Sequence, residues 1–232
     1  MSQARVRVAL TPPVPGTLPA EMCAVAVDVL RDTSTLAVAR QNGCGRVLPF
    51  GTTGEAIAYR DAHRADTLAC GERDGVMVAG FDLGNSPFEY TRERVAGKTL
   101  AFASTNGSRA MLAASRCHRL WLASFVNLSA TVEALAEESE IWLVCAGKLG
   151  AEASEDTACA ATIAARLAER GARLVGKETQ SIVAKACRDA TAVHRKVTGA
   201  SHGRWLASLG PAFAADVEFC AGLDTVGVAH PA

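Results

Sequence analysis

The order of apolar and polar residues along the chain predicts strands that alternate with helices. The clearest strand is Cys23–Leu30, CAVAVDVL, an apolar run interrupted only by Asp28, as expected of a strand that is covered on both faces. In the polar segment RDTST that follows, Thr33, Ser34 or Thr35 is expected to cap a helix ending at Gly43, and residues 45–50, GRVLPF, form a second strand. This part of the chain is predicted to be a strand, helix, strand unit.

Two later parts of the chain repeat this order. Strands are expected at 99–104 and 118–124 around one helix, and at 141–145 and 171–176 around another. Such alternation is typical of an α/β fold with three layers, α/β/α, and a mainly parallel or mixed sheet, and two intertwined subdomains are compatible with it. We expect residues 1–232 to form one domain, with 177–232 its more helical portion. In that portion we expect a helix over 177–194, a second short helix that ends at Gly210, and a tail from residue 216 that adds a strand or loop.

The amino-acid composition limits the kinds of molecule that the protein is expected to bind. The chain has 232 residues, 24 basic and 24 acidic side chains and 49% hydrophobic residues, so neither a nucleic acid nor an anionic membrane is expected to bind it. The N-terminus is too interrupted for a signal peptide, and no run reaches the roughly 20 apolar residues of a membrane helix. The eight cysteines form no CxxC pair, which favours buried thiols in a reducing cytoplasm over a zinc site. A homodimer is the default expectation.

The predicted strand ends gather the polar residues that could carry chemistry, because ligands of such sheets bind beyond the carboxyl ends of the strands. The loops after the three predicted strands include Arg31, Arg109 and Lys148. Asp28 is an acid in an apolar strand, where a carboxylate must be paired, protonated or metal-bound. Glu155 and Asp156 open a helix, where they either favour the helix dipole or share a magnesium ion. His202 could exchange a proton with a leaving oxygen, and Arg204 could hold an anionic group.

Two loops are candidates for holding an anion. Between a strand and a helix lies STNGSR, whose hydroxyls and backbone N–H groups suit a phosphate but also suit ordinary helix capping; its candidate residues are Ser104, Thr105, Asn106, Gly107 and Ser108. Residues 71–90 hold four glycines, which let a backbone close over a ligand or simply make turns. Glu72, Asp74 and Asp82 there suit a cation. Arg73, Asn85 and Ser86 suit phosphate or sulfonate oxygens.

These segments together resemble the 2-phosphosulfolactate phosphatase family of coenzyme M biosynthesis. The resemblance is carried, in order, by VDVLR with TST at 27–35, GER at 71–73, GFDLGNSPFEY at 80–90, GK at 97–98, STNGSRA at 104–110, SFVN at 124–127, CAG at 145–147, ED at 155–156 and SHGR at 201–204. Two departures stand out. Asp32 replaces a usual small residue after the VDVLR arginine, and STNGS replaces a more threonine-rich loop; the added charge of Asp32 could shift substrate preference.

The resemblance implies a magnesium-dependent phosphatase that removes phosphate from a 2-phospho-3-sulfo acid. We expect Mg²⁺ to be held among Asp28, Glu155 and Asp156, while Arg31, Arg73 and the 104–108 loop bind the phosphoryl oxygens and Arg204 holds the sulfonate or carboxylate. The nucleophile is either a water molecule or Asp28, with His202 as proton donor. Two alternatives stay open: a phosphatase for another small 2-phospho acid, and a non-catalytic protein that binds such an acid.

Overall fold

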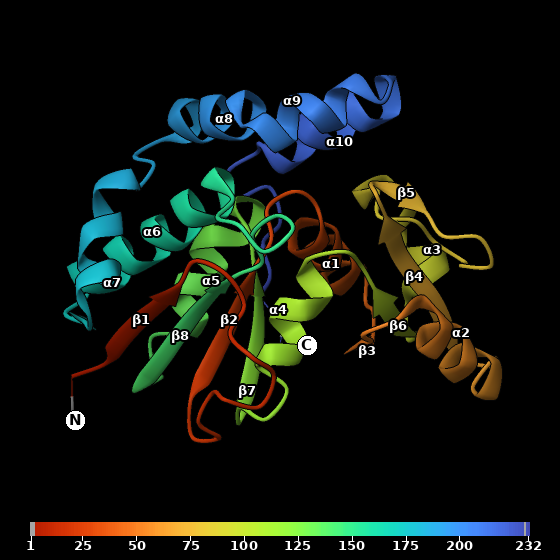
Figure 1. Ribbon diagram of the computed structural model, residues 1–232, viewed down its shortest axis with the longest axis horizontal. Helices are drawn as coiled ribbons and strands as arrows, with labels where there is room; N and C mark the ends of the chain where they lie inside the picture. The colour runs from red at the N-terminus through yellow and green to blue at the C-terminus, as the bar shows by residue number, and fades with distance from the viewer. Residues whose placement is uncertain (1–2, 230) are drawn as a thin grey trace.

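The strands divide between two sheets (Figure 1) in a computed structural model that describes residues 3–229 and 231–232. The first sheet is parallel throughout and has the order β7-β2-β8-β1-β9. Its strands are β1 (Arg5–Ala9), β2 (Cys23–Val27), β7 (Arg119–Ala123), β8 (Glu140–Cys145) and β9 (Arg173–Leu174). The second has the order β3-β6-β4-β5, with only β5 antiparallel among its described strands, and contains β3 (Arg46–Pro49), β4 (Thr67–Arg73), β5 (Val76–Met77) and β6 (Thr99–Ala103).

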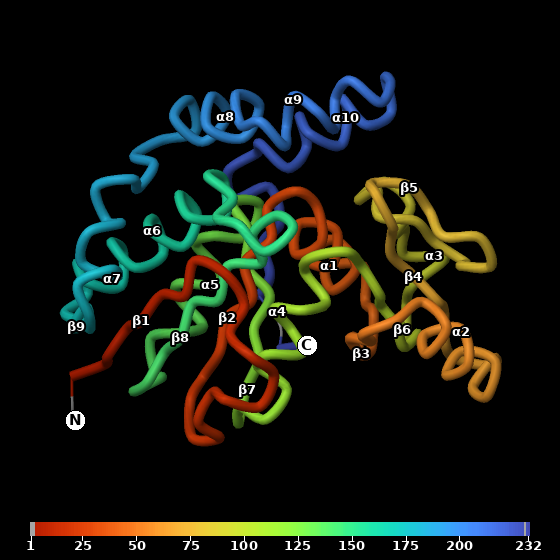
Figure 2. Tube along the Cα trace, in the orientation of Figure 1, coloured from red at the N-terminus to blue at the C-terminus, as the bar shows by residue number. Residues whose placement is uncertain are grey.

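Helices cover both sheets and also separate them, as the chain trace in Figure 2 shows. The helices are α1 (Asp32–Gln41), α2 (Thr53–Ala62), α3 (Arg92–Val95), α4 (Gly107–Ala113), α5 (Leu128–Ala134), α6 (Ser154–Glu169), α7 (Lys177–Ile182), α8 (Ala190–Gly199), α9 (Ser201–Ser208) and α10 (Pro211–Cys220). Three 3₁₀ turns are η1 (Pro87–Glu89), η2 (Phe125–Asn127) and η3 (Val183–Lys185). This arrangement confirms the predicted α/β class with mainly parallel strands. No helix in the described part of the chain combines the length and apolar character needed to cross a membrane.

The core is built in layers because strand residues alternate between the two faces of a sheet. On β2, Cys23, Val25 and Val27 face the helices α5 and α6, whereas Ala24 and Ala26 face α1 and α4. The same inner core joins α1 and α4 to the second sheet through Val47, Cys70, Leu100 and Phe102. The helices α1 and α4 are therefore a shared layer between the sheets (Figure 1).

This shared layer changes how the predicted units connect. We expected each strand, helix, strand unit to lie in one sheet, but β2-α1-β3 and β6-α4-β7 both cross from one sheet to the other. Along the chain, all four strands of the second sheet therefore fall between α1 and α4. The carboxyl ends of β2, β4, β6 and β8 nevertheless meet at one cavity, because the two sheets flank the same pair of helices.

Three local predictions differ from the structure, and one strand was not predicted. The helix after β2 begins at Asp32, because the hydroxyls of Thr33 and Ser34 bond to the carbonyls of Asp28 and Val29 instead of capping it. The single helix expected over 177–194 is broken into α7, η3 and α8. The helix is interrupted because the Cys187 N–H donates to Thr162 on α6 instead of continuing the helix. A new helix then starts where the Asp189 carboxylate caps α8 by accepting from the Ala192 N–H at 2.8 Å.

The other two differences lie at the ends of the chain. Residues 5–9 form β1, which pairs with β8. This strand was not predicted, because arginines alternate with its apolar residues. The predicted strand or loop from residue 216 onwards begins inside α10, and its residue 230 lies outside the described residues. All eight cysteines are free thiols, seven of them buried, as the sequence predicted.

Candidate active site

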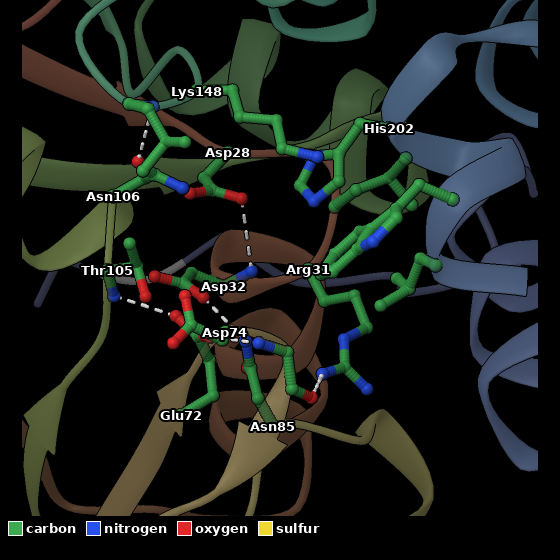
Figure 3. Close-up of a pocket in the computed structure, with 15 residues that line it drawn as sticks. Asp28, Arg31, Asp32, Glu72, Asp74, Asn85, Thr105, Asn106, Lys148 and His202 are labelled. Atoms are coloured by element: carbon green, nitrogen blue, oxygen red, sulfur yellow. Dashed lines mark hydrogen bonds between the residues drawn. The ribbon is translucent and has the colours of Figure 1, made fainter. Parts of the chain in front are cut away.

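The carboxyl ends of the strands from both sheets enclose a cavity of about 270 Å³ (Figure 3). One part of its lining is polar and mostly acidic, and another part combines cationic, aromatic and aliphatic side chains. The lining residues are Asp28, Leu30, Arg31, Asp32, Glu72, Asp74, Gly75, Asn85, Thr105, Asn106, Lys148, Leu149, His202, Trp205 and Leu206.

Asp28 lies directly after β2, and its side chain is buried in the cavity wall. Its backbone is fixed by Thr33, whose hydroxyl donates to the Asp28 carbonyl at 2.7 Å. Oδ1 of the carboxylate accepts a long bond of 3.3 Å from the Asp32 N–H, and no described residue donates to Oδ2. Burial first, and then the charges of Asp32 and Asp156, raise the pKa of Asp28 well above its ordinary value.

Asp32 opens α1 and faces the same cavity. Its carboxylate accepts bonds from Asn85 Nδ2 at 2.6 Å and from the Ser104 hydroxyl. Gly107 permits this approach, because a Cβ at that position would overlap the Asp32 carboxylate and come within 2.8 Å of Asp28 Oδ2. Burial and the charge of Glu72 raise the pKa of Asp32 to about 6. The STNGS loop therefore packs against this carboxylate.

Glu72 brings a third carboxylate to the cavity from the end of β4. Its two oxygens accept backbone N–H bonds from Thr105 and Gly75, each at 2.7 Å. These bonds tie the turn after β4 to the loop after β6 across the cavity wall. Buried atoms without a hydrogen-bond partner among the described residues include Asn85 Oδ1 and Thr105 Oγ1, and both residues line the cavity.

Arg31 reaches the cavity, but its guanidinium group is engaged elsewhere. It donates to the Asp216 carboxylate at 2.5 Å and to the Gly75 carbonyl at 2.6 Å, and it lies over the ring of Phe213. Ser86 donates to the other oxygen of Asp216 at 2.6 Å. Asp216 on α10 thus neutralises Arg31 and joins it to the 80–90 segment, a role that nothing in the local sequence pattern indicated.

A second wall of the cavity is formed by α9 and the loop after β8. His202 lines the cavity, with its Nδ1 atom 3.3 Å from Glu155 Oε1. Burial raises the pKa of Glu155, but the contacts with His202 and with its own backbone N–H outweigh burial and leave the pKa below its ordinary value. The ionised Glu155 can orient the imidazole ring, and Glu155 itself does not line the cavity.

Asp156 is directed away from the cavity toward the backbone. Its two oxygens accept N–H bonds from Val29 at 2.8 Å and from Gly147 at 3.0 Å, so it holds the loops after β2 and β8 together. Burial and the neighbouring Glu155 raise the pKa of Asp156 well above its usual range. The structure therefore does not gather Asp28, Glu155 and Asp156 around one open position.

Several other predicted residues lie outside the cavity lining. Asp82 accepts from Arg60 and from the Ala69 N–H, Arg73 donates to the carbonyl of Glu72, and exposed Arg204 donates to the carbonyl of Gly199. Ser86 lines a smaller neighbouring cavity with Arg31. Ser104 and Ser108 bond to each other's backbone and support the loop. Of the predicted set, the cavity itself brings together Asp28, Arg31, Glu72, Asn85, Thr105, Asn106 and His202.

The acidic wall fits a magnesium ion in its chemistry. In the described part of the chain no three His, Cys, Asp or Glu side chains are grouped so as to hold a metal by themselves. Magnesium, however, binds through one or two carboxylates together with waters and substrate phosphate oxygens. Asp28 offers an oxygen without a donor, and Asp32 and Glu72 add negative charge that raises the pKa of their neighbours. A divalent cation would relieve that repulsion.

Comparison with known proteins gives a consistent answer. The family model described as 2-phosphosulpholactate phosphatase matches residues 11–230. The chain belongs to the 2-phosphosulfolactate phosphatase family. It is similar to a "Probable 2-phosphosulfolactate phosphatase" of Thermotoga petrophila, 40% identical over 201 residues that cover 85% of this chain and 83% of the relative. It is also similar to a protein of the same name from Synechococcus sp. strain JA-2-3B'a(2-13), 39% identical over 209 residues, which are 89% and 86% of the two chains.

Membership of the 2-phosphosulfolactate phosphatase family confirms the family and the enzyme class, a phosphoric monoester hydrolase, that the ordered motifs predicted. Several of those motifs meet at the cavity, including VDVLR, GER and STNGS. Sequence reasoning named Asp74 as an acid suited to a cation and Lys148 as a rim residue, but assigned neither of them a role in the site. It did not select Trp205, and it treated Asp32 only as a departure. Asp32 could have been found by its place at a strand end, whereas Trp205 carries no sequence signal beyond its position beside His202.

Proposed function

We propose that this protein is a magnesium-dependent phosphatase that hydrolyses 2-phospho-3-sulfolactate to 3-sulfolactate and phosphate, a step that would serve coenzyme M biosynthesis. The observation that carries the proposal is the buried Asp28 carboxylate. It lines the cavity, and no described residue donates a hydrogen bond to one of its two oxygens. A phosphatase needs such a group beside a charge clamp and a proton donor. Asp32 and Glu72 would help to hold the cation that supplies this clamp, and His202 lies in the same cavity.

Mg²⁺ would be held by Asp28 with Asp32 or Glu72, and when bound it would neutralise the phosphate and polarise its P–O bonds. This choice replaces the predicted partners Glu155 and Asp156, because neither of them lines the cavity, whereas Asp28, Asp32 and Glu72 all do. Thr105 and Asn106 stand at the start of α4 and would donate to the phosphoryl oxygens. The Thr105 hydroxyl has no partner among the described residues, which supports this assignment.

Asp28 is our choice of nucleophile. Its carboxylate would attack phosphorus while the ester P–O bond breaks, and His202 would give a proton to the departing oxygen of the hydroxy acid. Water would then hydrolyse the aspartyl phosphate, returning the carboxylate and releasing phosphate. The contact with Glu155 leaves the other ring nitrogen of His202 able to exchange that proton. Direct attack by a water molecule that Asp28 orients is the alternative.

The wild-type protein tests the proposal directly. Release of inorganic phosphate from 2-phospho-3-sulfolactate should be measured with magnesium and again with EDTA, and kcat/KM should be compared with phosphoglycolate and phospholactate. We expect magnesium-dependent release that is fastest with 2-phospho-3-sulfolactate. A higher kcat/KM for another 2-phospho acid would change the substrate, and protection against heat without turnover would show a binding protein instead of an enzyme.

A further inference from the structure

Lys148 has a defined position at the mouth of the cavity. Its backbone N–H and carbonyl bond to Ala151 at 2.8 and 3.0 Å, which closes a tight turn. The next residue of that turn, Leu149, donates its N–H to Asn106 Oδ1 at 3.0 Å. The Lys148 ammonium lies 4.1 Å from the centre of the Trp205 ring, within the range of a cation–π contact. Both ends of this long side chain are therefore held in place.

The charge of Lys148 differs from that of Arg31 in having no ionic partner. Arg31 is paired with the buried Asp216, whereas no acidic group among the described residues lies within ion-pair distance of the Lys148 ammonium. Burial lowers the pKa of Lys148, although the charge of Glu155 acts in the opposite direction. A partly desolvated cation that lines a cavity is stabilised when an anion binds there.

Trp205 holds Lys148 in place from α9 and also touches the opposite side of the cavity mouth. Its ring lies against Gly75, where a Cβ would come within 3.2 Å of the indole. The His202 ring lies 5.6 Å from the same indole. In Figure 3, Lys148 and His202 lie on one side of Asp28, and Asp32, Glu72 and Asn85 lie on the other. The cavity thus has an acidic end and a cationic end.

We infer that Lys148, held against Trp205, binds the acid group of the substrate that is not hydrolysed, and so selects phosphate esters that carry a second anionic group. The inference rests on the proposed function, in which the phosphate occupies the acidic end through its metal ion. A sulfonate or carboxylate on a neighbouring carbon would then lie toward Lys148. A simple phosphate monoester would leave this cation without a partner.

Binding of the product tests the inference without any turnover. Calorimetric titration of 3-sulfolactate and of inorganic phosphate, both with magnesium, should be compared for the wild type, Lys148→Met and Lys148→Arg. We expect Lys148→Met to weaken 3-sulfolactate binding about tenfold or more and phosphate binding less than about twofold, since it removes one charge-assisted contact. Lys148→Arg should retain part of the affinity, and Lys177→Met, at an exposed position on α7, should match the wild type.

Fluorescence gives a second readout of the same contact. Binding of 3-sulfolactate should change the emission of Trp205, and this change should be lost in Trp205→Phe but kept in Trp121→Phe. Equal weakening of phosphate and 3-sulfolactate by Lys148→Met would assign Lys148 to the phosphate and overturn the inference, as would unchanged affinity for both or no binding of 3-sulfolactate by the wild type. Selective binding of 3-sulfolactate without release of phosphate from 2-phospho-3-sulfolactate would refute the proposed function but leave the inference about Lys148 standing.

Discussion

Two pairs of buried acids stand where a helix starts after a parallel strand, and they differ in what surrounds their oxygens. Asp28 and Asp32 flank the start of α1, and Glu155 and Asp156 lie in the first turn of α6. All four side chains are buried. Asp156 accepts two backbone N–H bonds, whereas Asp28 keeps one oxygen to which no described residue donates a hydrogen bond.

The comparison shows that acidity at a strand end does not by itself make a metal or catalytic site. Asp156 differs from Asp28 in that it lies outside the cavity lining and both its oxygens accept backbone N–H bonds, and this depends on which loops the fold brings beside it. Asp156 fastens two loops that build the cavity, and Asp28 faces into the cavity. The following variants separate these two uses.

Asp28→Asn should have the largest effect on activity. Removing the proposed nucleophile while keeping its volume should lower kcat by roughly 10³-fold or more, because an amide cannot form the phosphoryl bond. Stability should be unchanged or higher, since the variant removes a charge whose burial raises its pKa. Phosphate release and thermal unfolding measure the two effects, and the exposed Asp66→Asn is the matched control. Near-normal turnover in a folded variant would remove Asp28 from the chemistry.

Asp156→Ala should act on stability. It leaves the buried N–H groups of Val29 and Gly147 without an acceptor, at about 1–3 kcal/mol each, partly offset by removal of a buried charge, so the free energy of unfolding should fall by roughly 2–4 kcal/mol. Urea denaturation measures this loss, and Asp156→Asn should lose less because its amide oxygen keeps one acceptor. If Asp156→Ala lost activity with normal stability, Asp156 would belong with Asp28.

Glu155→Gln should have a smaller effect on rate. The variant keeps the shape of the side chain but removes the charge facing His202, so we expect kcat to fall about tenfold with little change in KM. His202→Gln should cost roughly 10²-fold or more, as for a general acid. Steady-state kinetics on both variants and on their double variant will show whether they act through one contact; fully additive losses would mean that they do not.

The pH dependence of stability should show the smallest effect. In EDTA, the pKa of Asp32 is about 6 in the folded protein and near 3.9 in the unfolded chain. Between these values the folded state binds more protons, so the free energy of unfolding should rise as the pH falls through 6 toward 4. Asp32→Asn should flatten this dependence in urea titrations. If the free energy of unfolding of the wild type fell as the pH was lowered from 6 to 4, and Asp32→Asn behaved in the same way, the pKa of Asp32 would not be raised in the folded protein.

Features of the site that depend on neighbouring residues could be predicted from the sequence, and contacts between distant residues could not. The α/β class, the strands around Asp28 and the family were available from local patterns, because apolar runs and ordered motifs are properties of neighbouring residues. The partners of the charged side chains were not available from such local patterns. Arg31 was expected to hold phosphate, yet Asp216, 185 residues further along the chain, pairs with it.

The sequence by itself determined the central strands, the family and the rim residues that follow those strands, since burial of an apolar run and the end of a strand are encoded locally. Only the tertiary structure decided that the strands form two sheets around α1 and α4, that Asp156 fastens loops, and that Lys148 lies over Trp205. Those outcomes depend on which distant side chains and backbone N–H groups come within hydrogen-bond or van der Waals distance. Close packing of helices between two sheets sets those distances, and spacing along the chain does not record them.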